Sequence, residues 1–133
     1  MADIMHLLRI RAEPERVYTA LATPEGIRSW WTPEADLDLH VGGVGEFRFH
    51  GGEKITRVRI EALEPPSRIV WRTIGSFRPE WADTVIIFRI QPSPEGATLL
   101  FSHRGFPHAD EDYALCTTGW AIYLTRLQQI AEA

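Results

Sequence analysis

A strict alternation of apolar and polar side chains recurs through the second and third quarters of this chain and beyond. Its clearest instance is 56–62, where Val58 and Ile60 alternate with Arg57 and Arg59. A period of two residues places successive side chains on opposite faces of a β-strand. Repeated alternation therefore predicts an antiparallel sheet with one wet face and one face that must be covered. The alternating segments are 37–41, 47–49, 56–62, 86–90 and 99–103.

The end of the chain predicts the cover for this sheet. Its apolar and small side chains recur at helical spacing, at Tyr113, Cys116, Thr117, Trp120, Leu124 and Leu127. Near the start, residues 3–11 read as a strand. A first short helix begins at Pro14, and a second begins after the capping Thr23 and ends near Trp31. This order predicts one α+β domain over residues 1–133, with a curved seven-stranded antiparallel sheet, two short helices and a long C-terminal helix.

Charge and composition exclude several classes of partner. The net charge of -4 and the scattered arginines argue against nucleic acid, which a basic face would bind. No apolar run is long enough to insert into a membrane or to act as a signal peptide. The single cysteine, Cys116, cannot form an internal disulfide, so we expect a cytoplasmic protein.

Aromatic residues point to the place of a ligand. Five Trp and six Phe are many for this length, and inward-facing rings either fill a core or line a cavity for an apolar guest. Phe77 and Trp81, in a predicted loop over 74–82, would lie at the cavity mouth, or else staple that loop or form a dimer contact. The predicted ligand-binding residues are Trp31, Phe47, Phe49, Val58, Ile60, Trp71, Phe77, Trp81, Ile86, Phe88, Phe101, His103, Tyr113, Thr117 and Trp120.

Two residues are candidates for catalysis. His103 shares the inward parity of Leu99 and Phe101, and its pKa near neutrality permits proton transfer, although a structural histidine would show the same pattern. Tyr113, on the inner face of the long helix, could pair with His103 to polarise a ketone.

No metal or cofactor is expected. His40 and His50 fall on the wet side of their predicted strands, and neither H-x-x-x-H nor C-x-x-C spacing occurs. Cys116 reads as a buried small hydrophobe, and the acidic run at 110–112 reads as a helix cap.

Several motifs, in order, resemble the helix-grip fold of the START/Bet v 1-like superfamily, and in particular its branch named after the activator of Hsp90 ATPase. Each motif is weak alone, but together they span nearly the whole chain. They are Ala12-x-Pro14-x-x-Val17-Tyr18-x-Ala20-Leu21, Trp30-Trp31, Val41-Gly42-Gly43, Glu64-Pro65-Pro66-Ser67-Arg68-Ile69-Val70, Thr98-Leu99-x-Phe101-x-His103-x-Gly105 and Gly119-Trp120-x-x-Tyr123-Leu124-x-x-Leu127.

The resemblance implies three functions, and a fold alone does not choose between them. The leading expectation is binding of a hydrophobic or aromatic small molecule between the sheet and the C-terminal helix. The first alternative is a polyketide cyclase or dehydratase that uses His103 and Tyr113. The second is a chaperone-linked interaction domain that binds Hsp90, ranked last because no distinct partner surface is visible. A homodimer is also considered.

Overall fold

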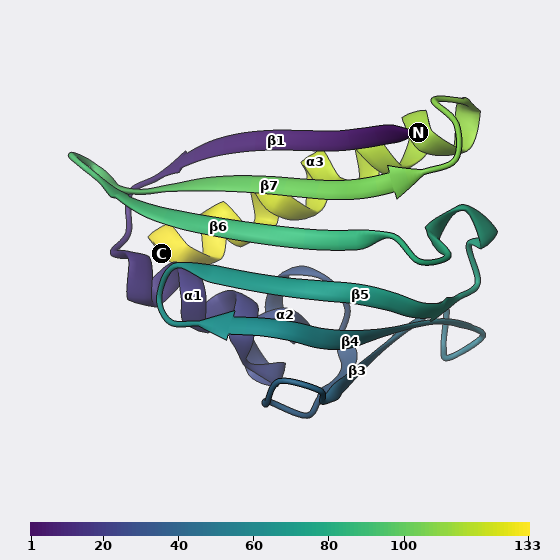
Figure 1. The fold of residues 1–133 in the computed structure, drawn as a ribbon. Helices are drawn as coiled ribbons and strands as arrows, with labels where there is room; N and C mark the ends of the chain where they lie inside the picture. The colour runs from purple at the N-terminus through teal and green to yellow at the C-terminus, as the bar shows by residue number, and fades with distance from the viewer.

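The computed structural model describes residues 1–133 and has one antiparallel sheet with three helices on one face (Figure 1). The strand order is β1-β7-β6-β5-β4-β3-β2, so the first strand pairs with the last. This confirms the predicted α+β fold with seven strands, two short helices and one long helix. The elements are β1 (Ala2–Ile10), α1 (Pro14–Ala22), α2 (Pro24–Trp30), β2 (Glu34–Leu37), β3 (Val44–Phe49), β4 (Lys54–Glu64), β5 (Arg68–Ser76), the 3₁₀ turn η1 (Pro79–Trp81), β6 (Val85–Ser93), β7 (Gly96–Phe106) and α3 (Glu111–Glu132).

Each helix begins where the local chemistry favours it. Proline is the first residue of both α1 and α2, where its missing N–H leaves no bond unmade. The Thr23 hydroxyl accepts the Gly26 N–H at 3.0 Å. The Asp110 carboxylate caps α3 by accepting the Tyr113 N–H at 3.1 Å, as expected for the acidic run. None of the three helices combines the length and the apolar character needed to cross a bilayer.

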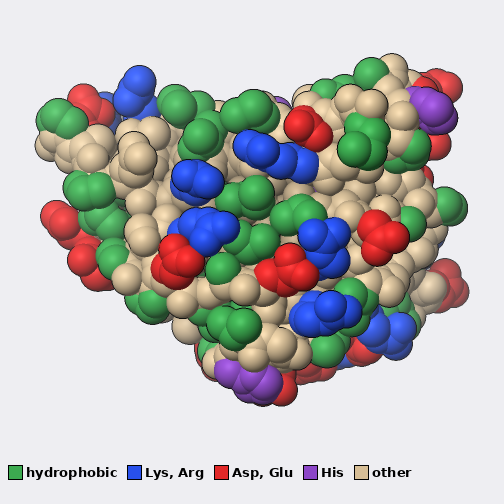
Figure 2. Space-filling view, viewed as in Figure 1, with side chains coloured by type: hydrophobic (Ala, Val, Ile, Leu, Met, Phe, Trp, Pro, Cys, Tyr) green, Lys and Arg blue, Asp and Glu red, His purple; other side chains and the backbone are tan.

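The outer face of the sheet, turned toward the viewer in Figure 2, interleaves basic and acidic side chains. Glu46 and Arg57 are direct partners in the β3–β4 register and form an ion pair of 2.8 Å. Arg72 of β5 and Glu61 of β4 also form an ion pair, of 3.0 Å, although they are not register partners. Such half-exposed pairs contribute little energy, but they identify this face as the predicted wet one.

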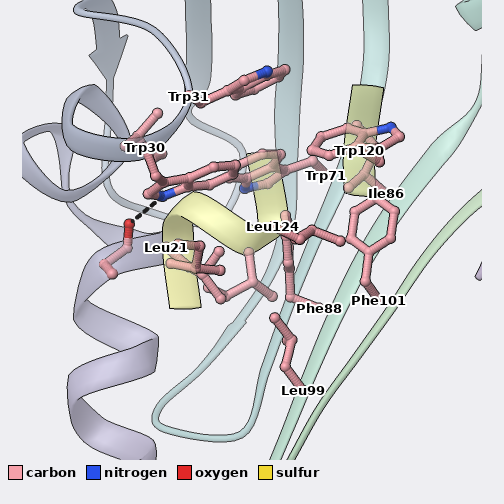
Figure 3. Packing of buried hydrophobic residues seen from close by; sticks show 14 of the residues in the cluster. Leu21, Trp30, Trp31, Trp71, Ile86, Phe88, Leu99, Phe101, Trp120 and Leu124 are labelled. Atoms are coloured by element: carbon pink, nitrogen blue, oxygen red, sulfur yellow. Dashed lines mark hydrogen bonds between the residues drawn. The ribbon is translucent and has the colours of Figure 1, made fainter. Parts of the chain in front are cut away.

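The inner face of the sheet carries the core. A cluster of 28 buried hydrophobic residues joins the sheet to all three helices. Figure 3 shows Leu124 of α3 among the rings of Trp71, Trp120 and Phe88. The Trp30 indole N–H donates to the Ala20 carbonyl at 2.9 Å, so α2 is tied to α1 through a buried, satisfied polar group.

The strand predicted from the alternation at 37–41 is not present. The strand β2 ends at Leu37, and Leu39 and Val41 are 45% and 61% exposed in a turn. The backbone there bonds locally, with the His40 N–H to the Asp38 carbonyl at 2.9 Å, and Gly42 has a φ of 90°. Alternating hydropathy does not reveal that a chain reverses within the segment.

Three other expectations are corrected at strand ends. His40 lies in that turn rather than on a strand, and His50 begins the turn after β3 with a φ of 53°. The loop predicted over 74–82 is shorter, because β5 continues to Ser76 and pairs there with β4.

Helix α3 is clamped to the edge strand β1 by side chains. The Tyr113 hydroxyl donates to the Asp3 carbonyl at 2.7 Å, and the Gln128 amide donates to the Arg9 carbonyl at 2.9 Å. These bonds occupy carbonyls on the free edge of β1, which would otherwise be open to pairing with another chain. The clamp therefore both seats the helix and protects the sheet edge.

We predict that Tyr113→Phe lowers the free energy of unfolding by about 0.5–1 kcal/mol, because it removes one hydrogen bond of the clamp. Tyr123→Phe is the matched control, since the Tyr123 hydroxyl makes no hydrogen bond and lies on the same helix. Urea titration of both variants measures the difference. Equal stability of the two variants would show that the Tyr113 bond of the clamp contributes nothing.

Candidate functional site

A pocket of about 130 Å³ opens between the N-terminal half of α3 and the near ends of β3, β4 and β5. It lies where one straight helix leaves part of the curved sheet uncovered. Its walls come from four parts of the chain that are far apart in sequence. The lining residues are Trp31, Phe49, His50, Lys54, Thr56, Phe77, Arg78, Trp81, Leu115, Cys116, Gly119, Trp120 and Tyr123.

Three tryptophan rings form the floor of the pocket. The ring centres of Trp31 and Trp120 are 5.3 Å apart, and those of Trp81 and Trp120 are 6.0 Å apart and nearly parallel. All three side chains are buried. Phe49, which contacts Trp31 at 5.6 Å, continues this surface toward the mouth. The floor is an apolar aromatic surface to which a ring or a short aliphatic group can pack.

A buried hydrogen-bond chain holds two of these rings in place. The Trp120 indole N–H donates to Nδ1 of His103 at 3.0 Å, and Nε2 of His103 lies 2.8 Å from the Thr84 hydroxyl. The Thr84 hydroxyl donates in turn to the Trp81 carbonyl at 2.7 Å. The chain runs from α3 through β7 to the residues just after η1, so it fixes the helix relative to both.

This chain also determines the protonation of His103. An indole can only donate, so Nδ1 must accept and the proton of the neutral ring lies on Nε2. Burial lowers the pKa of His103 to about 3, since the fully enclosed ring cannot hydrate a charge. Neither ring nitrogen is free to take a proton from a ligand.

The predicted catalytic pair does not form. His103 faces inward, as its parity indicated, but it is sealed behind packed rings and does not line the pocket. The Tyr113 hydroxyl bonds to β1 instead of to His103. Helical spacing correctly places Tyr113 on the sheet side of α3, but it does not specify which strand lies opposite.

Cys116 lies on the pocket wall without being a nucleophile. The Trp81 indole N–H donates to its Sγ at 3.2 Å, and burial raises the pKa of the thiol above its ordinary value. A neutral, hydrogen-bonded thiol reacts slowly. The residue serves as a small apolar group that positions Trp81.

The structure divides the predicted ligand-binding residues into three sets. Trp31, Phe49, Phe77, Trp81 and Trp120 lie on the pocket wall. Tyr113 and Thr117 are half-buried outside it, and the Thr117 hydroxyl bonds to the Tyr113 carbonyl of its own helix. The fully buried residues of the core are Phe47, Val58, Ile60, Trp71, Ile86, Phe88, Phe101 and His103.

Sequence reasoning missed several residues of the wall, and two of them carried a usable signal. Gly119 stands in the middle of a helix, where glycine is unfavourable. Lys54 is the only lysine of the chain. The other residues that were not predicted to bind a ligand are His50, Thr56, Arg78, Leu115, Cys116 and Tyr123.

Two wider hollows lie elsewhere, beside α1 and the C-terminal end of α3. Their volumes are about 570 and 580 Å³, but both are open to solvent and lined mainly by polar and charged side chains. No three His, Cys, Asp or Glu side chains gather closely enough to hold a metal ion. The aromatic pocket is therefore the candidate functional site.

A sheet that grips one long helix, with a pocket between them, defines the helix-grip class of the START/Bet v 1-like superfamily. The chain belongs to the family described as activator of Hsp90 ATPase homolog 1-like protein, whose sequence profile matches residues 11–132. This confirms the resemblance noted from the motifs. No curated protein is a significant match to the sequence.

Solved structures agree with this assignment. The solution structure of the Aha1 dimer from Colwellia psychrerythraea is 30% identical, with a TM-score of 0.89, and the match covers 99% of this chain and 97% of that one. A crystal structure of a protein from Chromobacterium violaceum is 26% identical, with a TM-score of 0.81 and coverage of 100% and 99%. A crystal structure of a protein from Mesorhizobium loti is 23% identical, with a TM-score of 0.83 and coverage of 96% and 95%, and shows the fold alone.

We predict that His103 makes the protein less stable as the pH falls. Between about pH 7.5 and 5 the unfolded chain protonates this histidine at its ordinary pKa of 6.5, while the buried ring stays neutral. The unfolded state then binds more protons, so the free energy of unfolding falls by about 2 kcal/mol over this interval.

Urea titrations at several pH values measure this slope for the wild type and for His103→Gln. Glutamine offers both a donor and an acceptor but does not titrate. The variant should lose this part of the pH dependence whatever its stability at neutral pH. A slope that is the same in the variant and the wild type would mean that His103 takes up protons in the folded protein as readily as in the unfolded chain.

Proposed function

We propose that this protein binds a small hydrophobic or aromatic molecule in the pocket under α3. The observation that carries the proposal is an unfilled space beside three tryptophan rings. A Cβ atom added to Gly119 would meet no atom within 4 Å, although this residue lies within a helix packed on the sheet. Family membership supports a ligand-binding domain of this general kind.

The volume limits the size of the ligand. An engineered cavity of about 150 Å³ with apolar walls binds benzene, and this pocket measures about 130 Å³. It accommodates one ring or an equivalent aliphatic group, and the rest of any larger ligand would extend through the open mouth. The mouth is bordered by Phe77, which is 36% exposed.

Gly119 supports the proposal on energetic grounds. Glycine inside a helix costs about 1 kcal/mol relative to alanine, and no neighbouring atom requires its small size here. The cost is understandable if the missing side chain leaves room for a ligand. Trp120, the next residue, closes the pocket floor.

The two alternatives have less support. The predicted cyclase or dehydratase would use His103 and Tyr113 for proton transfer, and neither side chain lines the pocket. Binding to Hsp90 rests on the family description alone. Pull-down with purified Hsp90 tests it, and retention of the chain at a defined stoichiometry would revive it.

We predict that neutral phenylacetamide shifts the indole N–H signals of Trp31, Trp81 and Trp120 in an NMR titration. Trp30 is the internal reference, because its indole bonds to Ala20 away from the pocket. Gly119→Leu should abolish these shifts by filling the space, while its helix propensity maintains or raises stability. Thr118→Leu adds similar bulk at an exposed neighbouring position and should bind as the wild type does. Undiminished binding by Gly119→Leu would exclude this pocket.

We also propose that two copies associate in the cytoplasm. The Colwellia protein is described as a dimer and is 30% identical. Met5 and Leu7 are each 55% exposed on the outer face of β1, where a second copy would cover both apolar side chains. The unpaired Cys116 fits a reducing compartment.

Sedimentation equilibrium tests the association. We predict a dimer for the wild type and a monomer for Met5→Lys/Leu7→Lys, with unchanged phenylacetamide binding because β1 does not line the pocket. A wild type that stays monomeric over a wide concentration range would contradict the prediction.

A further inference from the structure

The mouth of the pocket is basic, although the chain as a whole is acidic. Its net charge is -4, yet the charged and imidazole side chains on the pocket wall are His50, Lys54 and Arg78, and no Asp or Glu is among the lining residues. Lys54 is the only lysine in the sequence. The pocket mouth is therefore positively charged, whereas the molecule as a whole is negatively charged.

The two cations lie against the exposed ring at the mouth. Nζ of Lys54 is 5.5 Å from the centre of the Phe77 ring, and Cζ of Arg78 is 5.1 Å from it. Both distances are within the range of a cation–π contact, which holds a flexible cation near an aromatic face. Each charged group is thus held at the pocket entrance and does not extend away into solvent.

The two cations differ in what else they contact. Arg78 has an acidic partner, since its guanidinium lies 3.6 Å from the Glu80 carboxylate. Lys54 forms no ion pair, unlike Arg57 on the same strand, which pairs with Glu46. One unpaired positive charge therefore borders an apolar pocket that holds a single ring.

We propose that the ligand is a small aromatic carboxylate, with its ring in the pocket and its carboxylate at Lys54. This inference rests on the proposed function, because it assumes that the pocket binds a ring. One unpaired cation matches the single charge of a carboxylate, while a phosphate monoester would bring nearly two negative charges. His50 also lines the pocket, and its imidazole N–H is a hydrogen-bond donor of the kind that a carboxylate accepts.

Three ligands of similar size separate charge from shape. Phenylacetate, phenylacetamide and 2-phenylethylamine share a phenyl ring, and their polar groups carry the charges minus one, zero and plus one. In the NMR titration of the full chain we expect phenylacetate to bind about fivefold more tightly than the amide, the effect of one partly exposed ion pair. The amine should bind more weakly than the amide, and added salt should reduce the differences.

Lys54→Met should remove the preference for the acid, so that phenylacetate and phenylacetamide bind the variant with similar dissociation constants. Arg59→Met is the matched control, because it removes one positive charge from the opposite, outward face of the same strand. Its preference for phenylacetate should stay at the wild-type value.

A second measurement uses the scarcity of amines in this chain. Lys54 and the N-terminal amine are the only primary amines of the chain, and an acetylating reagent modifies both. Phenylacetate should slow acetylation of Lys54 severalfold and leave the rate at Met1 unchanged, which peptide mass spectrometry resolves. Equal protection of both amines would overturn the assignment of the carboxylate to Lys54.

The outcomes distinguish the two proposals. Equal affinity for the acid and the amide would overturn the carboxylate inference and leave the ring-binding function standing. A preference for the acid that persists in Lys54→Met would overturn the role of Lys54. Failure of all three ligands to shift the Trp81 and Trp120 signals would overturn both proposals.

Discussion

The arrangement of this protein depends on how a single helix is fixed on the concave side of a sheet. The buried chain from Trp120 through His103 to Thr84 does this, because every donor and acceptor in it is satisfied only when α3 has one position. Apolar packing alone would tolerate some sliding of the helix along the sheet. Polar groups buried without their partners would each cost about 1–3 kcal/mol, and this cost specifies the register.

The same chain shapes the pocket. The Trp81 carbonyl accepts a hydrogen bond from the Thr84 hydroxyl, and the Trp81 indole N–H donates one to Cys116 of α3. Trp81 is therefore held at its backbone and at its ring. Trp120 is held through His103. The Trp81 and Trp120 rings on the pocket floor are therefore fixed before a ligand binds, which lowers the entropic cost of binding. His103 acts here by staying neutral and not by transferring protons.

The sequence predicted the fold well and the site only in part, for identifiable reasons. Periodicity assigns a residue to a face, and it placed Val58, Ile60 and His103 correctly on the inner face. It does not state how far along that face the helix extends, so rings of the packed core could not be separated from rings of the pocket. Nor does it identify the partner of a polar group, and for this reason Tyr113 was paired with the wrong neighbour.

Only a few residues distinguish this pocket from what the helix-grip fold itself requires. The helix-grip scaffold requires the buried rings and the caps, and these say little about chemistry. Gly119 and Lys54 are different: Gly119 weakens a helix, and Lys54 forms no ion pair and places its charge over the Phe77 ring at the pocket mouth. A residue that costs stability or adds none is better explained by what it leaves open to a ligand than by the fold around it. By this criterion the proposed function depends on the gap beside Trp120 and on the cation at its mouth.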